Sequence, residues 1–184
     1  MSDVSRKEKI IEHDFGFLSL AGGKYTTFRN VGEKVAKIVT SKLFPDYKFY
    51  SMTKNLPLYS GSIKNIDEFI QTHYKTDLKI CSIREESYRH LIEIYGHNYL
   101  SILHILSENE SYIDHLPNSK HLKGEVVYAI RHEIAQVIDD FMRRRTTISL
   151  EIGKNKDCIN AVADIFQSEL GWSDSEKENQ ISLF

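Results

Sequence analysis

The sequence has little cysteine, proline or glycine, and it lacks long apolar runs. Its two cysteines, Cys81 and Cys158, are far apart and do not have the spacing of metal ligands, so they predict a reducing compartment and no disulfide framework. No apolar run approaches the roughly 20 residues that a membrane-spanning helix needs. The start MSDVSRKEKIIEHD is too charged for a secretory signal. These absences predict a cytoplasmic protein that is soluble or at most peripheral to a membrane.

Composition and charge are those of a globular protein without a strong electrostatic preference. The chain has 184 residues, 41% hydrophobic and 27% charged, with a net charge of -2, which gives no general attraction to nucleic acid. The basic run RRRTT at 143–147 invites a phosphate-binding interpretation. Asp139 and Asp140 lie one turn upstream, however, where they can pair with these arginines. We therefore expect the arginines to stabilise a helix end, and we expect no nucleic-acid partner.

The first forty residues predict a strand, a glycine turn and a helix. The apolar run Phe17–Leu20 is closed by Gly22 and Gly23, as expected of a short buried strand. A helix should then begin with Thr26 or Thr27 as its N-cap. Because a single strand leaves its backbone groups unpaired, this segment is expected to be the end of a larger α/β domain.

The rest of the chain predicts helices. Residues 44–62 hold two of the three prolines and lack periodicity, which indicates a linker. Helices are expected after Asn65 and Ser82, each of which has a glutamate three residues later, and Gly96 should end the second of them. We expect further helices at 99–106, at 125–144 and in the segment that ends before Gly171.

The predicted helix 125–144 is the longest and most regular, and we expect it to lie in the core. Its apolar residues recur at steps of three and four: Val127, Ile130, Ile134, Val137, Ile138 and Phe141. The sequence thus divides into residues 1–43, the linker 44–62 and a helical domain at 63–184.

Three histidines, His90, His97 and His104, recur every seven residues, a spacing that would align metal ligands along one continuous helix. Gly96 interrupts such a helix. We therefore interpret them as isolated surface or cap histidines and predict no metal site. His132 and Glu133 are interpreted in the same way, as a polar pair on a helix face rather than acid/base machinery.

Two motifs resemble the C-terminal portion of FAD-dependent glycerol-3-phosphate dehydrogenases and the related glycerol-3-phosphate oxidases. The first, AGGKYTTFRNVGEKVA, keeps the family pattern Gly-Gly-Lys-x-Thr-Thr-[Tyr/Phe]-Arg at 22–29. The second, EVVYAIRHEIAQVIDDFMRRRTTISL, resembles the long helix of the family's C-terminal helical domain. With the helices between them, the motifs cover nearly the whole chain. The resemblance implies a mainly α fold: a helical C-terminal domain preceded by a strand-turn-helix remnant of an FAD-binding α/β domain.

The resemblance also assigns site residues. It places Lys24 at the active site as a catalytic residue, on the substrate phosphate or the reacting oxygen, and it places Gly22, Gly23, Tyr25 and Thr26 at the cofactor. Glycines allow the backbone to approach a flat ring, and a helix N-terminus with a nearby lysine stabilises the negative charge of a reduced flavin. The alternative is a turn that merely permits tight strand-to-helix packing, with Lys24 solvated.

The implied parent enzyme oxidises sn-glycerol 3-phosphate to dihydroxyacetone phosphate by hydride transfer to FAD, with a quinone or dioxygen as the final acceptor and with the inner membrane face as a further location. The family's N-terminal Gly-x-Gly-x-x-Gly loop has no match in these residues. We therefore expect a fragment that lacks the N-terminal FAD domain, binds no FAD by itself and is inactive. The alternative is a free-standing helical interaction module that forms a homodimer without catalysis.

Overall fold

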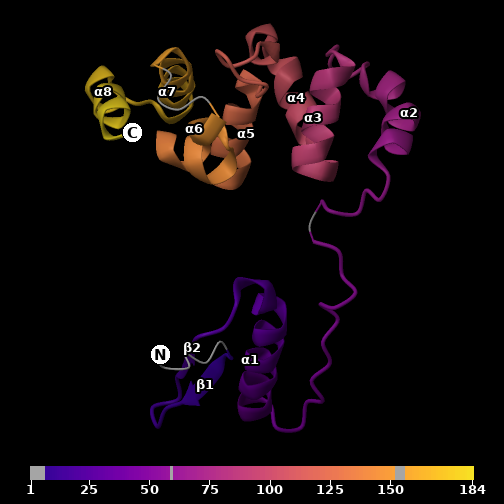
Figure 1. Ribbon diagram of the computed structural model, residues 1–184, viewed down its shortest axis with the longest axis vertical. Coiled ribbons are helices and arrows are strands. Elements are labelled where there is room, and N and C mark those ends of the chain that lie inside the picture. Colours follow the sequence, from indigo (N-terminus) through magenta and orange to yellow (C-terminus); the bar gives the residue numbers. More distant parts are fainter. Residues whose placement is uncertain (1–6, 59, 152–155) are drawn as a thin grey trace, which may run out of the picture. The chain divides into compact units, whose positions relative to one another are not determined.

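The computed structural model describes residues 7–58, 60–151 and 156–184, and most of these are helical. The chain divides into two compact units, Met1–Leu58 and Tyr59–Phe184 (Figure 1). The mainly helical class expected from the sequence is confirmed. Among the described residues, no helix is both long enough and apolar enough to cross a membrane.

The first unit begins with a two-stranded antiparallel hairpin. Strand β1 (Lys9–Glu12) pairs with β2 (Leu18–Ala21) in a register that sets Lys9 opposite Ala21. The strand predicted at Phe17–Leu20 therefore exists one residue later, but the expectation that it is unpaired is wrong. Its partner was missed because KIIE is a short apolar pair between charged residues, too brief to show a period.

Helix α1 (Phe28–Leu43) follows the hairpin after a 3₁₀ turn, Tyr25–Thr27. Its N-cap is Thr27, one of the two threonines expected there, although the hydroxyl of Thr27 donates to the carbonyl of Lys24 (2.8 Å) instead of capping the helix. Ion pairs join the hairpin to the helix, Glu8 with Lys34 and Glu12 with Lys42. Only Val31 of α1 is buried, so this unit has almost no core of its own.

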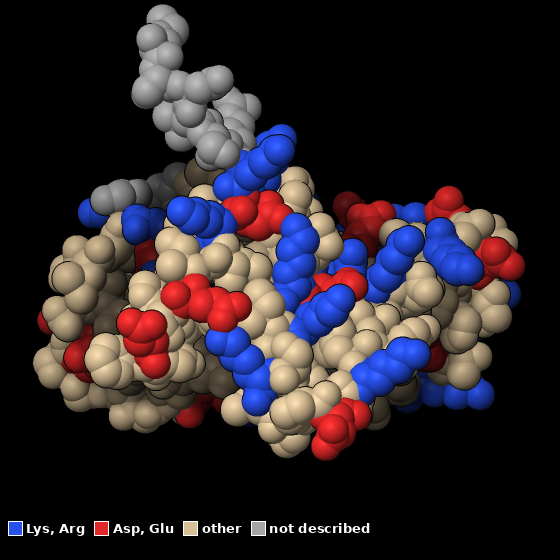
Figure 2. All heavy atoms as spheres, turned by 90° about the horizontal axis from the view of Figure 1, so that it is seen from below, with Lys and Arg blue, Asp and Glu red and all other residues tan. Residues whose placement is uncertain are grey.

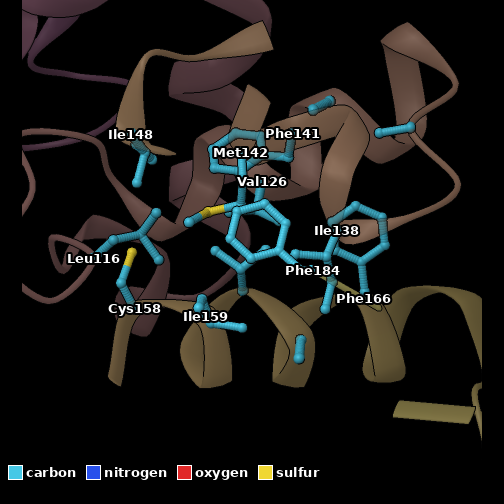
Figure 3. Packing of buried hydrophobic residues seen from close by; sticks show 14 of the residues in the cluster. Leu116, Val126, Ile138, Phe141, Met142, Ile148, Cys158, Ile159, Phe166 and Phe184 are labelled. Atoms are coloured by element: carbon cyan, nitrogen blue, oxygen red, sulfur yellow. The ribbon is translucent and has the colours of Figure 1, made fainter. Parts of the chain in front are cut away.

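Helices of the second unit pack on one another largely in chain order, as Figure 1 shows. Their bounds are α2 (Ile66–Asp77), α3 (Glu85–Tyr95), α4 (Tyr99–Glu108), α5 (Lys123–Glu133), α6 (Ile148–Glu151), α7 (Lys156–Leu170) and α8 (Asp174–Leu183). The buried apolar side chains form two clusters, one among α2, α3, α4 and α5 and the other around α5, the π-helical turn Asp140–Arg145 and α7. Figure 3 shows the second cluster, which includes Phe141, Phe166 and Phe184.

The predicted helix boundaries were partly correct. Asn65 caps α2 by accepting from the N–H of Glu68 (3.2 Å), as expected. Ser82 does not cap α3, because the helix begins after Arg84, whose backbone is extended. Gly96 ends α3 with a positive φ of 52°, and a Cβ there would lie 2.1 Å from the carbonyl oxygen of Ser60. Only glycine fits this junction.

The long helix expected at 125–144 is wrong. Helix α5 ends at Glu133, and Ile134 adopts the left-handed conformation (φ 57°, ψ 41°) with its side chain 75% exposed. The chain then turns, and the π-helical turn Asp140–Arg145 begins. Ile138 and Phe141 nevertheless lie in the same core as α5, which is why the apolar period continued through the break.

Helix α8 was not anticipated, because its sequence DSEKENQISL has few apolar residues. Ser173 caps it by accepting from the N–H of Glu176 (3.2 Å). The terminal Phe184 reaches the core, where the guanidinium of Arg143 lies 4.6 Å from the centre of its ring. A cation over an aromatic face is attractive, so this contact fastens the end of α8.

Candidate functional site

The Gly-Gly-Lys turn is shaped by its two glycines. Gly22 and Gly23 have φ values of 72° and 99°, which side chains other than hydrogen rarely allow. A Cβ on Gly22 would lie 3.0 Å from the carbonyl oxygen of Lys7, and one on Gly23 would contact the side chain of Glu8. The turn therefore passes close to the strand β1 side of the hairpin and leads directly into the 3₁₀ turn.

A groove of about 770 Å³ opens beside this turn. Its lining is mainly apolar and comes from β2, the turn and the first three turns of α1: Leu20, Tyr25, Phe28, Val31, Val35 and Val39, with Gly22, Gly23 and Lys24 at one end. Tyr25 is 90% exposed and its ring is 5.9 Å from that of Phe28. Four of the five residues assigned by resemblance thus meet at one groove, while Thr26 is exposed on the same turn.

Positive charge collects at this end of the groove. Every residue in the first turn of α1 is described by the structure, and none of them is acidic. The positive end of the helix dipole is therefore not neutralised within that turn. Lys24 is exposed and has no ion-pair partner in the part of the chain that the structure describes. Arg29 is held elsewhere, by Glu33 (2.8 Å) and Thr53 (3.2 Å).

A second polar cluster lies inside the helical unit, around the fully buried carboxylate of Glu125 in the first turn of α5. His90 of α3 approaches both carboxylate oxygens (3.1 and 3.2 Å), and His121 Nδ1 approaches Oε2 (2.7 Å). The hydroxyl of Tyr95 and the N–H of Leu122 donate to the same carboxylate (2.9 and 2.6 Å). We call His90, His121 and Glu125 the Glu125 cluster.

Glu125 is ionised despite its burial. Burial by itself raises the pKa of this carboxyl, but the hydrogen bonds and charges of His121 and His90 outweigh that effect and hold the pKa at about 2. Burial next to the carboxylate raises the pKa of Tyr95, so its hydroxyl stays a donor. The cluster therefore presents a carboxylate and two imidazoles at one point.

This arrangement corrects the interpretation of His90 as an isolated surface histidine. His90 is buried and contacts Glu125, 35 positions away in the chain. His104 is exposed, as expected, and His97 lies at the junction of α3 and α4 with its ring edge-on to Phe69. The His-x-x-x-Glu spacing of 121 and 125, which brings both residues together at the start of a helix, was a signal that could have located the cluster.

The other polar residues singled out in the sequence serve the local structure. Arg143 pairs with Asp139 (2.7 Å) and Arg144 with Asp140 (2.5 Å), which confirms the expected pairing. Arg145 also reaches the carboxylate of Glu133 (3.3 Å), so Glu133 pairs across the break rather than with His132. Acidic and basic side chains are intermingled on the face that Figure 2 shows.

Residues 51–177 match the family model described as the C-terminal domain of alpha-glycerophosphate oxidase. The chain belongs to this family. The match contains the Glu125 cluster and the helices from α2 to α7, whereas the Gly-Gly-Lys turn precedes it. The resemblance inferred from the sequence motifs is therefore confirmed.

Two glycerol-3-phosphate dehydrogenases match nearly the whole chain. An aerobic glycerol-3-phosphate dehydrogenase of Staphylococcus epidermidis is 31% identical over 185 residues, which cover 96% of this chain and 32% of that protein. A probable mitochondrial glycerol-3-phosphate dehydrogenase of Dictyostelium discoideum is 26% identical over 98% of this chain and 28% of its own length. The chain thus spans about a third of the curated relatives it matches.

The fold of this family member also agrees with a solved structure. The glycerol-3-phosphate dehydrogenase from Bacillus halodurans, determined in complex with FAD, superposes with a TM-score of 0.78 at 24% identity, over 95% of this chain and 35% of the other. This likeness supports the mainly helical fold of the chain.

Proposed function

We propose that this chain is the C-terminal part of a flavoenzyme that oxidises sn-glycerol 3-phosphate to dihydroxyacetone phosphate. The observation that carries the proposal is the Gly-Gly-Lys turn beside an apolar groove, just before a helix N-terminus. Its lysine has no ion-pair partner among the described residues. Membership of the C-terminal domain family and the similarity to glycerol-3-phosphate dehydrogenases support it.

The turn and groove fit one edge of a flavin. The isoalloxazine ring is flat and apolar on its faces, which suits a groove lined by Leu20, Tyr25 and Phe28, and its carbonyl edge is polar. Gly22 and Gly23 leave the backbone open to close approach. When bound, FAD supplies the acceptor for the hydride that leaves the substrate alcohol carbon.

Within this proposal Lys24 supplies a positive charge. Its ammonium and the helix dipole both favour negative charge at the same end of the groove. The negative charge belongs either to the edge of the reduced flavin or to the phosphate of the substrate. In both cases Lys24 lies beside the bound reactants. Tyr25 and Thr26, in the following 3₁₀ turn, would border the cofactor.

The exposed apolar surface of residues 7–58 supports a covering partner. Large side chains are well exposed there: Phe17, Leu20, Tyr25, Phe28, Leu43, Phe44, Tyr47 and Tyr50. Such a surface is expected to be buried in the working protein. We assign its cover to the N-terminal FAD domain of the complete enzyme. A second copy of the chain, in a helical dimerisation module without catalysis, is the alternative that the same surface allows.

An activity assay distinguishes the flavoenzyme from the dimerisation module. The complete protein that contains this chain is assayed for glycerol 3-phosphate-dependent reduction of an artificial electron acceptor, with and without dioxygen. We expect reduction of the acceptor, together with flavin absorbance that bleaches on adding glycerol 3-phosphate. A pure protein that carries no flavin, reduces no acceptor and forms a stable dimer would replace the enzyme proposal by the module.

A further inference from the structure

The Glu125 cluster joins three separate parts of the helical unit. His90 comes from α3, His121 from the loop before α5, and Glu125 from the first turn of α5. All three side chains are buried, with exposed fractions between 0% and 9%. One ligand atom from each lies within 4.8 Å of the others, and no other group of three such residues is found in the described ranges.

These side chains form a chemically suitable ligand set for a transition metal. Two imidazole nitrogens and one carboxylate oxygen are ligands typical of Zn²⁺ sites that keep a fourth position for water. With bonds of about 2.0–2.2 Å, tetrahedral ligand atoms lie about 3.3 Å apart. His90 Nε2 and His121 Nδ1 lie 3.2 and 2.7 Å from the same oxygen, Oε2, and the ligand atoms of the three residues all lie within 4.8 Å of one another. Changes of up to about 1.5 Å in these separations therefore bring them to the spacing of a metal site.

Two further contacts hold the carboxylate in place. The hydroxyl of Tyr95 donates to Oε2 and the N–H of Leu122 donates to Oε1. Hydrogen bonds of this kind orient the ligands of metal sites and are part of their design. They also remain compatible with an ion, since each carboxylate oxygen has a second lone pair.

Solvent reaches the cluster from the side of His90. A hollow of about 430 Å³ opens there, and its lining includes His90, Ser87 and His115. Ser87 is buried and its hydroxyl lies 3.4 Å from His115 Nε2. The hollow gives an ion a path of entry and gives its fourth position room for a water molecule.

We propose that His90, His121 and Glu125 bind one divalent transition-metal ion of the Zn²⁺ class. Coordination removes the protons from His90 Nε2 and His121 Nδ1: in a neutral imidazole the proton moves to the other ring nitrogen, and from an imidazolium it leaves to solvent. The ion ties α3 and the loop before α5 to α5. The inference replaces the sequence-based expectation of no metal site, and it is independent of the flavin proposal because the two sites share no residue.

The test is metal binding by the full chain of 184 residues after chelator treatment and dialysis. Zn²⁺ is titrated by calorimetry, and Co²⁺ is titrated while the visible spectrum is recorded. We expect one ion per chain, a Co²⁺ spectrum of the intense type given by four or five ligands that include imidazole, and a melting temperature that rises with Zn²⁺ concentration. If the wild-type chain binds neither ion, the proposal is wrong and the cluster is a buried hydrogen-bond network.

Matched variants locate the ion. His121→Gln and Glu125→Gln should each weaken Zn²⁺ binding by at least about tenfold to a hundredfold, the loss typical when a metal site is disturbed. His104→Gln, an exposed histidine on α4, is the control and should bind as the wild type does. His90→Gln, at the solvent side of the cluster, is the variant to use should Glu125→Gln fail to fold. Binding that all folded variants keep unchanged would place the ion on the surface and refute the assignment.

Discussion

Lys24 is the residue on which the proposed chemistry depends. Replacing it by alanine in the complete enzyme removes a positive charge from the groove, which we expect to lower turnover by about 10²–10³-fold. The melting temperature should stay unchanged, because the side chain is exposed. Lys37→Ala, an exposed lysine on the same helix, is the control. Turnover of the Lys24 variant within about threefold of wild type would contradict the catalytic assignment.

Gly96 supports a second prediction at the same scale. A Cβ at this position would lie 2.1 Å from the carbonyl oxygen of Ser60, so backbone must move to admit it. We expect Gly96→Ala to lower the free energy of unfolding by about 2–4 kcal/mol. Gly171→Ala is the control, because Gly171 also has positive φ but has open space around it, and it should cost about 1 kcal/mol. Denaturant melts compare them, and equal losses would show that the contact with Ser60 is not the cause.

At the scale of elements, the break between α5 and the π-helical turn depends on Asp140. Its carboxylate accepts from the N–H groups of Gln136 and Val137 (2.9 and 3.3 Å) and pairs with Arg144. Asp140 therefore acts as a capping residue for the turn. Its carboxylate accepts from N–H groups that have no backbone acceptor within the turn. Specific side-chain contacts of Asp140 therefore stabilise the break.

A pH-dependent prediction follows from this capping. Burial raises the pKa of Asp140, but the N–H groups of Gln136 and Val137 and the nearby arginines outweigh it and hold the pKa below its usual value. A lowered folded-state pKa adds stability that is present above the unfolded pKa of about 3.9 and is lost as the pH falls through the folded value.

Asp140→Asn should thus destabilise the chain by about 1 kcal/mol at neutral pH, and the difference from wild type should shrink below about pH 4. Asp114→Asn, which alters a well-exposed carboxylate paired with Lys123, should change little at any pH. Urea melts at several pH values measure both. A difference from wild type that stays constant down to pH 2.5, about a unit and a half below the usual value, would contradict the capping role.

At the scale of the whole molecule, the two units differ in how much they bury. The unit 1–58 buries one residue of α1, whereas the helical unit holds two apolar clusters. Because local opening is easiest where few apolar contacts hold an element, we expect amides of α1 to exchange much faster than those of α4. Hydrogen exchange of the dilute monomer measures this, and equally strong protection in both helices would contradict it.

The isolated chain should bind FAD weakly and should not oxidise glycerol 3-phosphate. It provides the turn at one edge of the proposed flavin, and its groove is open to solvent, so most of the ring and the pyrophosphate lack contacts. Flavin absorbance of the purified chain, before and after adding FAD, checks this expectation. A stoichiometric yellow preparation would show that the chain holds the cofactor by itself.

The sequence predicted the Gly-Gly-Lys turn better than it predicted the helix boundaries around the core. The glycine turn and the cap at Asn65 were predicted from the sequence because each depends on residues a few positions away. The role of Lys24 stays a prediction. Strand β1, the start of α3 and the end of α5 were not predicted, because pairing with β2, the backbone of Arg84 and the contacts of Asp140 decided them. Apolar periodicity correctly placed Val127, Ile130, Ile138 and Phe141 in the core, but it wrongly placed Ile134 there and wrongly predicted one unbroken helix.

The sequence by itself determined the helical character of the chain, its glycine turn and its family. These features depend on local residue spacing and on short sequence motifs, which do not require a three-dimensional structure. Only the tertiary structure decided that His90 meets His121 and Glu125, since residues 35 positions apart come together only when α3 packs beside α5. It also decided that Ile134 faces solvent, because a single residue in the left-handed conformation redirects the chain while its neighbours keep their places in the core.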